Sequence, residues 1–420
     1  MLTISFNNHY AVDPAHGMPE STFADHAEYL QPSLEKIHAR GQGFYTVIDE
    51  KAVLDEIETY AAEARTKFEN FVVCGIGGSA LGPIALRDSL NNFFGSKSLH
   101  VLENIDPDFL AEALDYLDLS KTLFLVTSKS GGTPETVAQY MLMRSELDKA
   151  GLDPAKHLVF ITDPEKSLLK DIGDRDGIRQ FAIPPSVGGR FSVQTPVGLL
   201  PLALMGHDIR AFMAGLQNMR DSFLNKNVDQ NLPFQLACAQ TAAYLKGKPQ
   251  NIIMPYHTKL RQIGAWCVQL IAESTGKFKA DGSNVGITPI PSLGVTDQHS
   301  QVQLFAEGPN DKLIIFIGVE NFRHELEIPV TEVNNKTDFM QGRTFKDLLH
   351  AEQQATAQAL TENDRPNLTI TIPEVNEYYL GQLIMLFEGA TAFWGEFFEI
   401  DAFNQPGVER GKVLTRELLK

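Results

Sequence analysis

Residues 123–136 read Leu-Phe-Leu-Val-Thr-Ser-Lys-Ser-Gly-Gly-Thr-Pro-Glu-Thr. The apolar run that opens this stretch is typical of a buried strand, and the polar turn after it ends at Thr133 and Pro134, which favour the N-cap and the first position of a helix. A strand that leads directly into a helix is the repeating unit of α/β proteins. This stretch therefore indicates an α/β fold.

The same alternation recurs on both sides of this stretch. Further short runs of strand character occupy residues 71–75, 99–102, 157–162, 180–183, 251–254, 287–290, 313–319 and 368–372. A helical zone over residues 209–246 separates the first group of runs from the second. The pattern predicts two α/β units, each a parallel sheet covered by helices on both faces.

Composition narrows the possible partners. The chain has 420 residues, enough for two or three domains, and carries 36 Lys and Arg against 53 Asp and Glu, a net charge of −17. Such a field repels nucleic acids and anionic lipid headgroups, so neither is expected as a partner. The longest apolar stretch, residues 196–205, is far shorter than the ~20 residues of a membrane-spanning helix.

The cysteines and the N-terminus indicate the compartment. Cys74, Cys238 and Cys267 lie too far apart in sequence to form a disulfide framework or a metal knuckle. The first residues, Met-Leu-Thr-Ile-Ser-Phe, lack the basic and apolar segments of a signal peptide. We expect a cytoplasmic protein.

The turn over residues 128–133 has the features of a phosphate site. The residues Ser128, Ser130 and Thr133 supply hydroxyls, Lys129 supplies a charge, and two glycines leave the backbone accessible. The free N–H groups and positive dipole end of the following helix favour an anion there. The alternative is a well-capped helix that follows a polar loop.

A glycine-rich turn follows the first run, as Gly75-Ile76-Gly77-Gly78-Ser79, with Pro83 expected near the start of the next helix. Its spacing imitates a dinucleotide-binding fingerprint, but Pro83 falls where that motif's helix should already be running. A nicotinamide-dependent dehydrogenase is thus one alternative. A simple tight turn is another.

Two further segments carry charged groups that suit proton chemistry. In Val187-Gly188-Gly189-Arg190, the glycines clear space beside a guanidinium that can stabilise an oxyanion. Residues 261–275 read as an amphipathic helix in which Gln269 and Glu273 share one face. The alternatives are a surface arginine and a surface pair of Glu273 with Lys277.

Two polar clusters remain. His299 lies in the segment Thr-Asp-Gln-His-Ser-Gln over residues 296–301, and Gln405 and Lys412 lie in the C-terminal segment. A histidine in such a place is more often structural or solvent-exposed than catalytic, and the C-terminal segment can equally be a solvated tail.

Six motifs together resemble the phosphoglucose isomerase family, in the family's order, from about residue 70 to Lys412. They are Gly-Ile-Gly-Gly-Ser, Ser-Lys-Ser-Gly-Gly-Thr-Pro-Glu-Thr, Val-Gly-Gly-Arg-Phe-Ser, Gln-x-x-x-Glu-Ser-x-Gly-Lys, Thr-Asp-Gln-His-Ser-Gln and Asn-Gln-Pro-Gly-Val-Glu-x-x-Lys. One departure is Pro185, which stands where many members have an acidic residue, and it leaves the loop before Arg190 open to question.

The resemblance implies two flavodoxin-like sugar-isomerase (SIS) domains, a homodimer, and interconversion of glucose 6-phosphate and fructose 6-phosphate through a cis-enediolate, in glycolysis and gluconeogenesis, without metal or cofactor. It assigns a role to each matching position. The residues that contact the substrate are Ser128, Lys129, Ser130, Thr133 and Gln405 for the phosphate, and Gly78, Ser79, Gly189 and Gln269 for the sugar. The residues of the reaction are Glu273 as the base, Arg190 facing the enediolate, and His299 and Lys412 for ring opening. In this family the histidine comes from the partner subunit.

The expected organisation is a helical arm over residues 1–45, a first SIS domain over 46–215 with the phosphate loop, a second over 216–402 with the base and the histidine, and a segment over 403–420 that completes the site. The rival functions are a non-catalytic sugar-phosphate sensor and a dual glucose and mannose phosphate isomerase. A sensor would not need Glu273, Arg190, His299 and Lys412 together.

Overall fold

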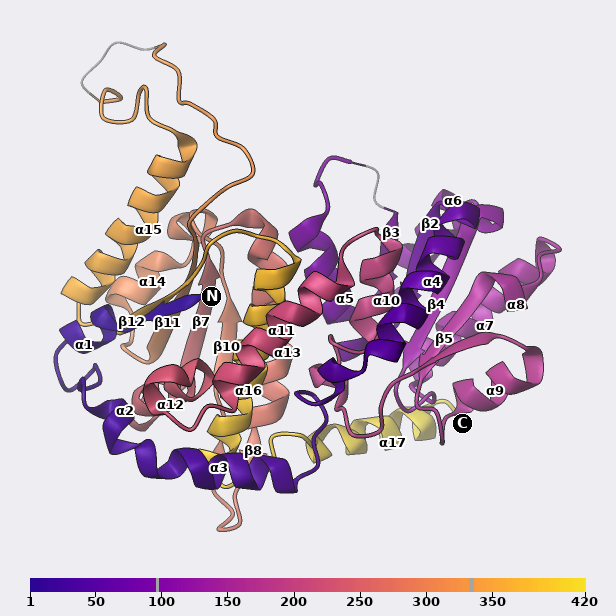
Figure 1. The fold of residues 1–420 in the computed structure, drawn as a ribbon, viewed down its shortest axis with the longest axis horizontal. Coiled ribbons are helices and arrows are strands. Elements are labelled where there is room, and N and C mark those ends of the chain that lie inside the picture. The colour runs from indigo at the N-terminus through magenta and orange to yellow at the C-terminus, as the bar shows by residue number, and fades with distance from the viewer. Residues whose placement is uncertain (96–97, 332–335) are drawn as a thin grey trace.

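Two five-stranded sheets, separated by helices, form the frame of the molecule (Figure 1). The structure is a computed structural model that describes residues 1–95, 98–331 and 336–420. The predicted α/β class with parallel sheets is confirmed. No helix in these described ranges is long and apolar enough to cross a bilayer.

The first sheet is wholly parallel and has the order β3-β2-β4-β5-β6. Its strands are β2 (Asn70–Cys74), β3 (Leu99–Leu102), β4 (Thr122–Ser128), β5 (Leu158–Thr162) and β6 (Arg179–Ala182). The chain runs from β2 outward to β3 and then returns to the other side of β2. The carboxyl ends of β2 and β4 therefore flank a topological switch point, where open α/β sheets bind ligands.

The second sheet has the order β1-β12-β11-β7-β10. Its strands are β7 (Gln250–Pro255), β10 (Thr288–Pro291), β11 (Lys312–Val319), β12 (Asn367–Ile372) and β1 (Thr3–Ser5). The first four repeat the winding of the first sheet, with the switch point between β7 and β11. The antiparallel strand β1 pairs with β12, so the N-terminal arm, expected to be helical, also contributes an edge strand.

Alternating side chains of the strands point to opposite faces and build separate cores. In β2, Val72 and Cys74 pack on an outer layer that includes α7, whereas Phe71 and Val73 face inward. In β7, Ile252 faces outward and the next residue joins the inner cluster. Because the inner faces of both sheets belong to one continuous cluster, the helices between them tie the two sheets together.

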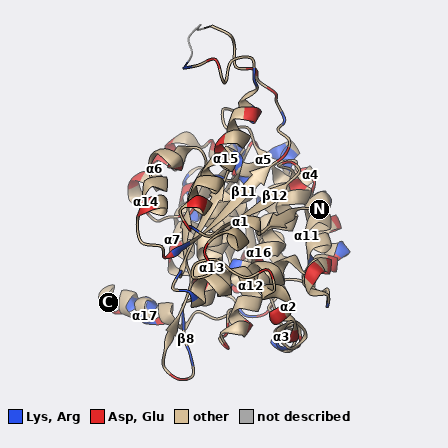
Figure 2. Ribbon diagram, turned by 90° about the vertical axis from the view of Figure 1, so that its left-hand side faces the viewer, with Lys and Arg blue, Asp and Glu red and all other residues tan. Residues whose placement is uncertain are grey.

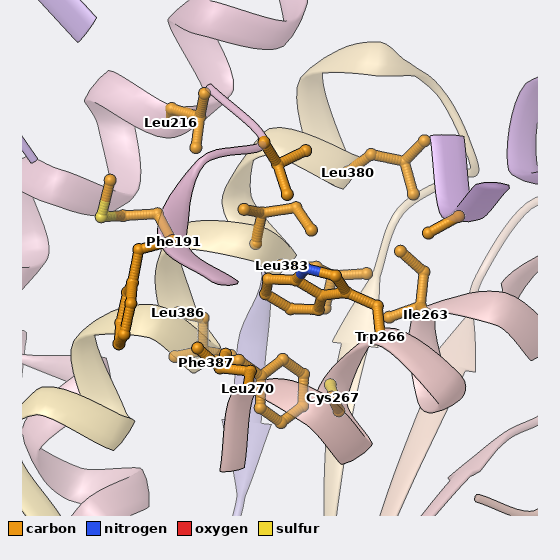
Figure 3. Close-up of a cluster of buried hydrophobic side chains, with 14 of the residues drawn as sticks. Phe191, Leu216, Ile263, Trp266, Cys267, Leu270, Leu380, Leu383, Leu386 and Phe387 are labelled. Atoms are coloured by element: carbon orange, nitrogen blue, oxygen red, sulfur yellow. The ribbon is translucent and has the colours of Figure 1, made fainter. Parts of the chain in front are cut away.

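The helices fall into three layers. The outer layer of the first sheet holds α6 (Pro107–Tyr116), α7 (Pro134–Lys149), α8 (Pro154–His157) and α9 (Leu168–Asp176), and that of the second holds α14 (Val302–Glu307) and α15 (Phe345–Glu362). The middle layer holds α4 (Lys51–Lys67), α5 (Gly78–Leu90), α10 (Pro196–Leu204), α11 (Ile209–Phe223), α12 (Leu232–Leu245), α13 (Arg261–Thr275) and α16 (Glu377–Phe397). Figure 3 shows Trp266 of α13 beside Leu383 of α16 in this layer.

The remaining helices lie toward the ends of the chain, and α3 packs on α16. They are α1 (Asn7–Ala11), α2 (Thr22–Asp25), α3 (Ala27–Ala39) and α17 (Glu409–Leu418). A short ribbon of β8 (Lys277–Phe278) and β9 (Asn284–Val285) follows α13.

Helices α5 and α13 pack against each other in opposite directions. At the start of α5, Gly77 lies against the side chain of Gln269, near the end of α13. At the other end of α5, the hydroxyl of Ser89 donates to the carbonyl of Lys259, just before α13 begins. Each end of this helix pair therefore lies near the switch point of one sheet: the α5 start near that of the first, and the α13 start near that of the second.

Glu388 is a buried carboxyl in the middle of α16. It is fully buried, its Oε2 accepts a 2.8 Å hydrogen bond from Gln194, and burial raises its pKa well above the usual glutamate value. The native state therefore holds a proton that the unfolded chain releases near the ordinary pKa. Stability from this group is present at low pH and is lost as pH rises.

We expect Glu388→Gln to stabilise the protein increasingly as pH rises. The gain should grow by about 1.4 kcal/mol for each pH unit above the ordinary glutamate pKa, while Glu388 stays protonated in the native state. Thermal midpoints of both proteins at pH 5 and pH 8 measure this. A difference that is independent of pH would contradict it, and exposed Glu28→Gln serves as the control.

Candidate active site

Glycines at the end of β2 allow three elements to meet. Gly77 has φ +58°, and a Cβ there would lie 2.8 Å from Nε2 of Gln269. A Cβ on Gly78 would lie 2.2 Å from the carbonyl oxygen of Gly189. This turn therefore brings the start of α5 against both α13 and the segment before Arg190, which a simple tight turn would not require.

Helix α5 begins earlier than the position of Pro83 predicts. It starts at Gly78, with Gly77 as N-cap, and Pro83 lies inside it. The amides of Ala80 and Leu81 already bond to the carbonyl of Gly77. Ser79 is half-buried in the first turn, beside Gly78.

The hydroxyl-rich turn follows β4, which is paired with β2, so the two turns occupy the same sheet edge. Thr133 is the N-cap residue of α7, but its side chain makes no capping hydrogen bond. Instead its Oγ1 lies 2.9 Å from Oγ of Ser128 and 3.4 Å from Oγ of Ser130. Three hydroxyls therefore converge at a helix N-terminus, an arrangement suited to a phosphate.

Lys129 lies in this turn, as predicted, and its side chain contacts the segment that follows β6. Its ammonium donates to the carbonyl oxygens of Pro185, at 2.8 Å, and Val187, at 2.6 Å. The side chain therefore connects the hydroxyl turn to the segment that precedes Arg190. Because the bonds to Pro185 and Val187 use backbone oxygens, the proline at 185 is compatible with this connection.

Arg190 is almost fully buried, with its side chain 2% exposed. Its Nε donates to Oγ of Ser274 at 2.7 Å and its Nη1 to Oε1 of Gln405 at 2.9 Å. Its Nη2 donates to the carbonyls of Ala402, at 2.5 Å, and Asn404, at 3.0 Å. These bonds fix the guanidinium and hold the chain that leads into the C-terminal segment, so Arg190 is not a surface arginine.

Glu273 lies beside this guanidinium. Its Oε2 is 3.6 Å from Nη1 of Arg190, and its Oε1 accepts a 3.3 Å hydrogen bond from Nε2 of Gln269. The Glu273 side chain is 36% exposed, so it remains accessible to a ligand. Oε1 of Gln269 is buried without a hydrogen-bond partner among the described residues. Such an acceptor is available to a hydroxyl of a bound molecule.

Lys277 does not form the surface ion pair considered for Glu273. Its ammonium donates to the backbone carbonyls of Glu273 and Ser274 at the end of α13. Burial, and then the charge of Arg190, lower its pKa to about 8. Lys277 therefore caps α13 and adds positive potential near the Glu273 carboxylate.

Two predicted residues lie apart from this cluster within one chain. His299 is exposed, and its side chain makes no hydrogen bond or ion pair within residues 1–95, 98–331 and 336–420. Lys412 is on α17, where it pairs with Glu409 at 2.7 Å. Every residue of α17 is exposed, and the helix projects from the body of the molecule (Figure 2). The structure thus joins Glu273, Arg190, Gln269 and Gln405, but not His299 or Lys412.

Gln405 and Gly189 have positions that refine their predicted contacts. The side chain of Gln405 binds Arg190, whereas a phosphate contact was predicted. A Cβ on Gly189 would meet no atom within 4 Å, so this glycine borders open space.

Ser274 was not predicted as a site residue, although its hydroxyl accepts a 2.7 Å hydrogen bond from Nε of Arg190. Its signal was its place directly after Glu273 in the same motif.

Comparison with known proteins identifies similar chains. A family model described as phosphoglucose isomerase matches residues 42–420. A glucose-6-phosphate isomerase of Carboxydothermus hydrogenoformans is 45% identical over 379 residues, which cover 87% of this chain and 82% of that protein.

Solved structures agree with this result. A crystal structure of a hypothetical protein from Thermus thermophilus has a TM-score of 0.92 at 37% identity and covers 100% of both chains. A glucose-6-phosphate isomerase from Chlamydia trachomatis has a TM-score of 0.79 at 27% identity, covering 88% of this chain and 73% of that one.

Proposed function

Because this chain belongs to the phosphoglucose isomerase family, we propose that it interconverts glucose 6-phosphate and fructose 6-phosphate. The observation that carries the proposal is the Glu273 carboxylate, accessible and 3.6 Å from the buried guanidinium of Arg190. A base beside a fixed cation is what proton transfer through an enediolate requires. A sensor that only binds sugar phosphates would have no use for this pair.

The proposed reaction moves one proton between two adjacent carbons. Glu273 removes the proton from C2 of the open-chain aldose, and the electron pair shifts toward C1 and its oxygen to give a cis-enediolate. Arg190 stabilises the negative charge while the hydroxyl proton on O2 passes to O1. The C2–O bond then becomes the carbonyl as Glu273 returns a proton to C1. Gln269 orients the carboxylate through Nε2 and accepts a substrate hydroxyl at Oε1.

The phosphate is proposed to bind at Ser128, Ser130 and Thr133. Their hydroxyls converge at the start of α7 and donate to the phosphate oxygens. Binding a remote phosphate there fixes the reacting carbons near Glu273, so binding energy is used for orientation. Gly78, Ser79 and Gly189 are proposed to contact the sugar.

Glucose 6-phosphate labelled with deuterium at C2 tests the reaction. We expect the label to leave C2 during turnover, with part found at C1 of fructose 6-phosphate and part lost to water, because the carboxyl can exchange its proton. Nuclear magnetic resonance of the products measures both fractions. Complete transfer of the label without any exchange would indicate a hydride shift and overturn the enediolate.

Thr133→Val should mainly weaken substrate binding. It removes a hydroxyl that bonds a charged group, and such bonds contribute about 1.5–3 kcal/mol, so KM should rise about ten- to a hundredfold with a smaller change in kcat. Steady-state kinetics with glucose 6-phosphate measure this. Thr59→Val on the exposed face of α4 is the matched control. An unchanged KM would place the phosphate elsewhere.

The active unit is proposed to be a homodimer in which His299 of the partner subunit, with Lys412, opens the sugar ring, and in which residues 403–420 complete the site. The exposed positions of His299 and of α17 support this, because α17 presents Val413, Leu414 and Leu418 to solvent. A helix with an exposed apolar side is suited to packing on another surface.

Mixing two inactive variants tests this sharing. Unfolding and refolding Glu273→Gln together with His299→Ala should restore about a quarter of wild-type activity, because half the dimers are hybrids and each has one intact site. Each variant refolded alone is the control. If activity does not recover although hybrid dimers form, His299 acts within its own subunit.

We propose a cytoplasmic location and a role in glycolysis and gluconeogenesis. The three cysteines, Cys74, Cys238 and Cys267, are buried and unpaired, which suits a reducing compartment.

A further inference from the structure

The second sheet has a switch point of its own, near the end of the α5–α13 pair that lies away from the Glu273 cluster. Strands β7 and β11 are adjacent and parallel, and the chain leaves β7 toward β10 before it returns to β11. His257 and Lys259 follow the carboxyl end of β7, and Arg323 follows that of β11. This is the same location in the second sheet that the glycine and hydroxyl turns occupy in the first.

The two switch points are also built alike from the middle helices. At the first, the end of α13 supplies Gln269 and Glu273. At the second, the end of α5 lies in the equivalent place: the ammonium of Lys259 donates to the carbonyl of Asn91, and Nη1 of Arg323 donates to that of Leu90 at 3.4 Å. The antiparallel packing of α5 and α13 therefore creates a second location with the architecture of the first.

A cavity of about 570 Å³ lies at this second location. Its lining includes His257, Lys259, Asn321, Arg323, Glu374 and the ring of Phe93. The volume is in the range that small-molecule sites occupy. None of these residues belongs to the Glu273 cluster or to the hydroxyl turn.

The charges around the cavity are not balanced by ion pairs. Lys259 and Arg323 contact no carboxylate within the described parts of the chain; their polar contacts are backbone carbonyls. The nearby Asp88 is paired with Arg87 at 2.7 Å, and Glu374 is the single carboxylate of the lining. In a protein of net charge −17, two cations held together without partners favour an anion.

The remaining groups indicate how the neutral part of a ligand is held. Burial, followed by the charges of Lys259 and Arg323, lowers the pKa of His257 to about 4, so its ring is neutral, and it stacks on Phe322 with centroids 5.0 Å apart. Nη1 and Nη2 of Arg323 each make one contact with a carbonyl, so three of its five N–H donors have no partner among the residues that the structure describes.

We propose that this cavity binds a phosphorylated small molecule that also carries hydroxyl groups, with the phosphate on Lys259 and Arg323 and the hydroxyls on Asn321 and Glu374. The site is separate from that of the isomerisation, and its occupant need not be turned over. The guanidinium supplies several donors in a fixed plane and the ammonium a point charge, a combination suited to a phosphate monoester.

Glycerol 3-phosphate, a phosphate monoester with two hydroxyls, is the probe. Equilibrium dialysis of the labelled compound should give two molecules bound per wild-type chain. The double variant Ser128→Ala/Thr133→Val, which disables the hydroxyl turn, should retain one. Lys259→Gln/Arg323→Gln should weaken the other at least about tenfold, because it removes two charged donors.

Three further measurements make the result decisive. Lys149→Gln/Arg175→Gln, with the same change of charge on exposed helices of the first sheet, should bind like wild type. Isomerase activity of Lys259→Gln/Arg323→Gln should persist, which shows that it folds. If the double variant proves unstable, Arg323→Glu alone, at an exposed position, takes its place. This variant should also lose the second bound molecule.

Two outcomes overturn the proposal. One is that Ser128→Ala/Thr133→Val binds no probe up to about 10 mM, the weak end of specific affinities. The other is that both Lys259→Gln/Arg323→Gln and Arg323→Glu bind the second molecule as wild type does. Neither outcome bears on the isomerase, whose activity is measured separately.

Discussion

Glu273→Gln should lower kcat for the isomerisation of glucose 6-phosphate by about a thousandfold, since a positioned general base contributes about 10²- to 10⁴-fold and, among the described residues, Glu273 is the carboxylate that pairs with Arg190 and hydrogen-bonds Gln269. Glutamine keeps the size of the side chain but cannot accept the C2 proton. Binding of the substrate should persist, because the hydroxyl turn is unchanged. A coupled assay for turnover and isothermal titration for binding measure the two effects.

The chain offers a closely matched control for this variant. Glu362 ends α15, and its Oε1 accepts a 2.8 Å hydrogen bond from Nε2 of Gln358, the same spacing as Gln269 and Glu273. Glu362→Gln removes an equivalent charge far from Arg190 and should leave kcat unchanged. Substantial turnover by Glu273→Gln would show that another group removes the proton.

Arg190→Met should reduce kcat/KM by about 10²- to 10³-fold, the usual loss on removing one donor from a developing oxyanion. Arg190→Lys should also be strongly impaired, although it keeps the charge. A lysine cannot reproduce donation to Ser274, Gln405 and two carbonyls at once. Both variants should expose residues 402–405 to faster amide hydrogen exchange, because those carbonyls lose their donor.

Exposed Arg179→Lys, at a position paired with Glu56, is the control for the change of residue type. The ratio of kcat/KM between the two Arg190 variants separates the contribution of the positive charge from that of the hydrogen bonds that hold the guanidinium. If Arg190→Lys retains most of the activity that Arg190→Met loses, the charge contributes most. If both variants lose activity equally, the hydrogen bonds contribute most. Full activity of both would remove Arg190 from the mechanism.

The strands could be predicted because apolar β-branched runs end at polar turns. The predicted run 368–372 and the observed Asn367–Ile372 differ by one residue. Strand β1 was missed because three residues, with burial alternating only weakly, carry almost no pattern; their pairing with β12 is purely long-range.

The sequence predicted which residues form the site more completely than it predicted the contacts between them. Gln269 and Glu273 share a helix face by periodicity alone, so their proximity could be foreseen. The hydrogen bonds of Lys129 with Pro185 and Val187, and of Gln405 with Arg190, join segments that are distant in sequence. A long flexible side chain can reach several partners, and only the three-dimensional arrangement of these segments decides which one it meets.

Because strand β1 pairs with β12, the second sheet can be completed only late in synthesis. Strand β1 is made first, yet its partner β12 is made near the end, and the amide of Leu2 donates to Gln382, 380 residues later. At about 5–20 residues per second, the ribosome needs about 20–75 s to deliver that partner. Until then the last edge of the second sheet cannot close, so incomplete chains released early would carry an open β edge that is prone to aggregation.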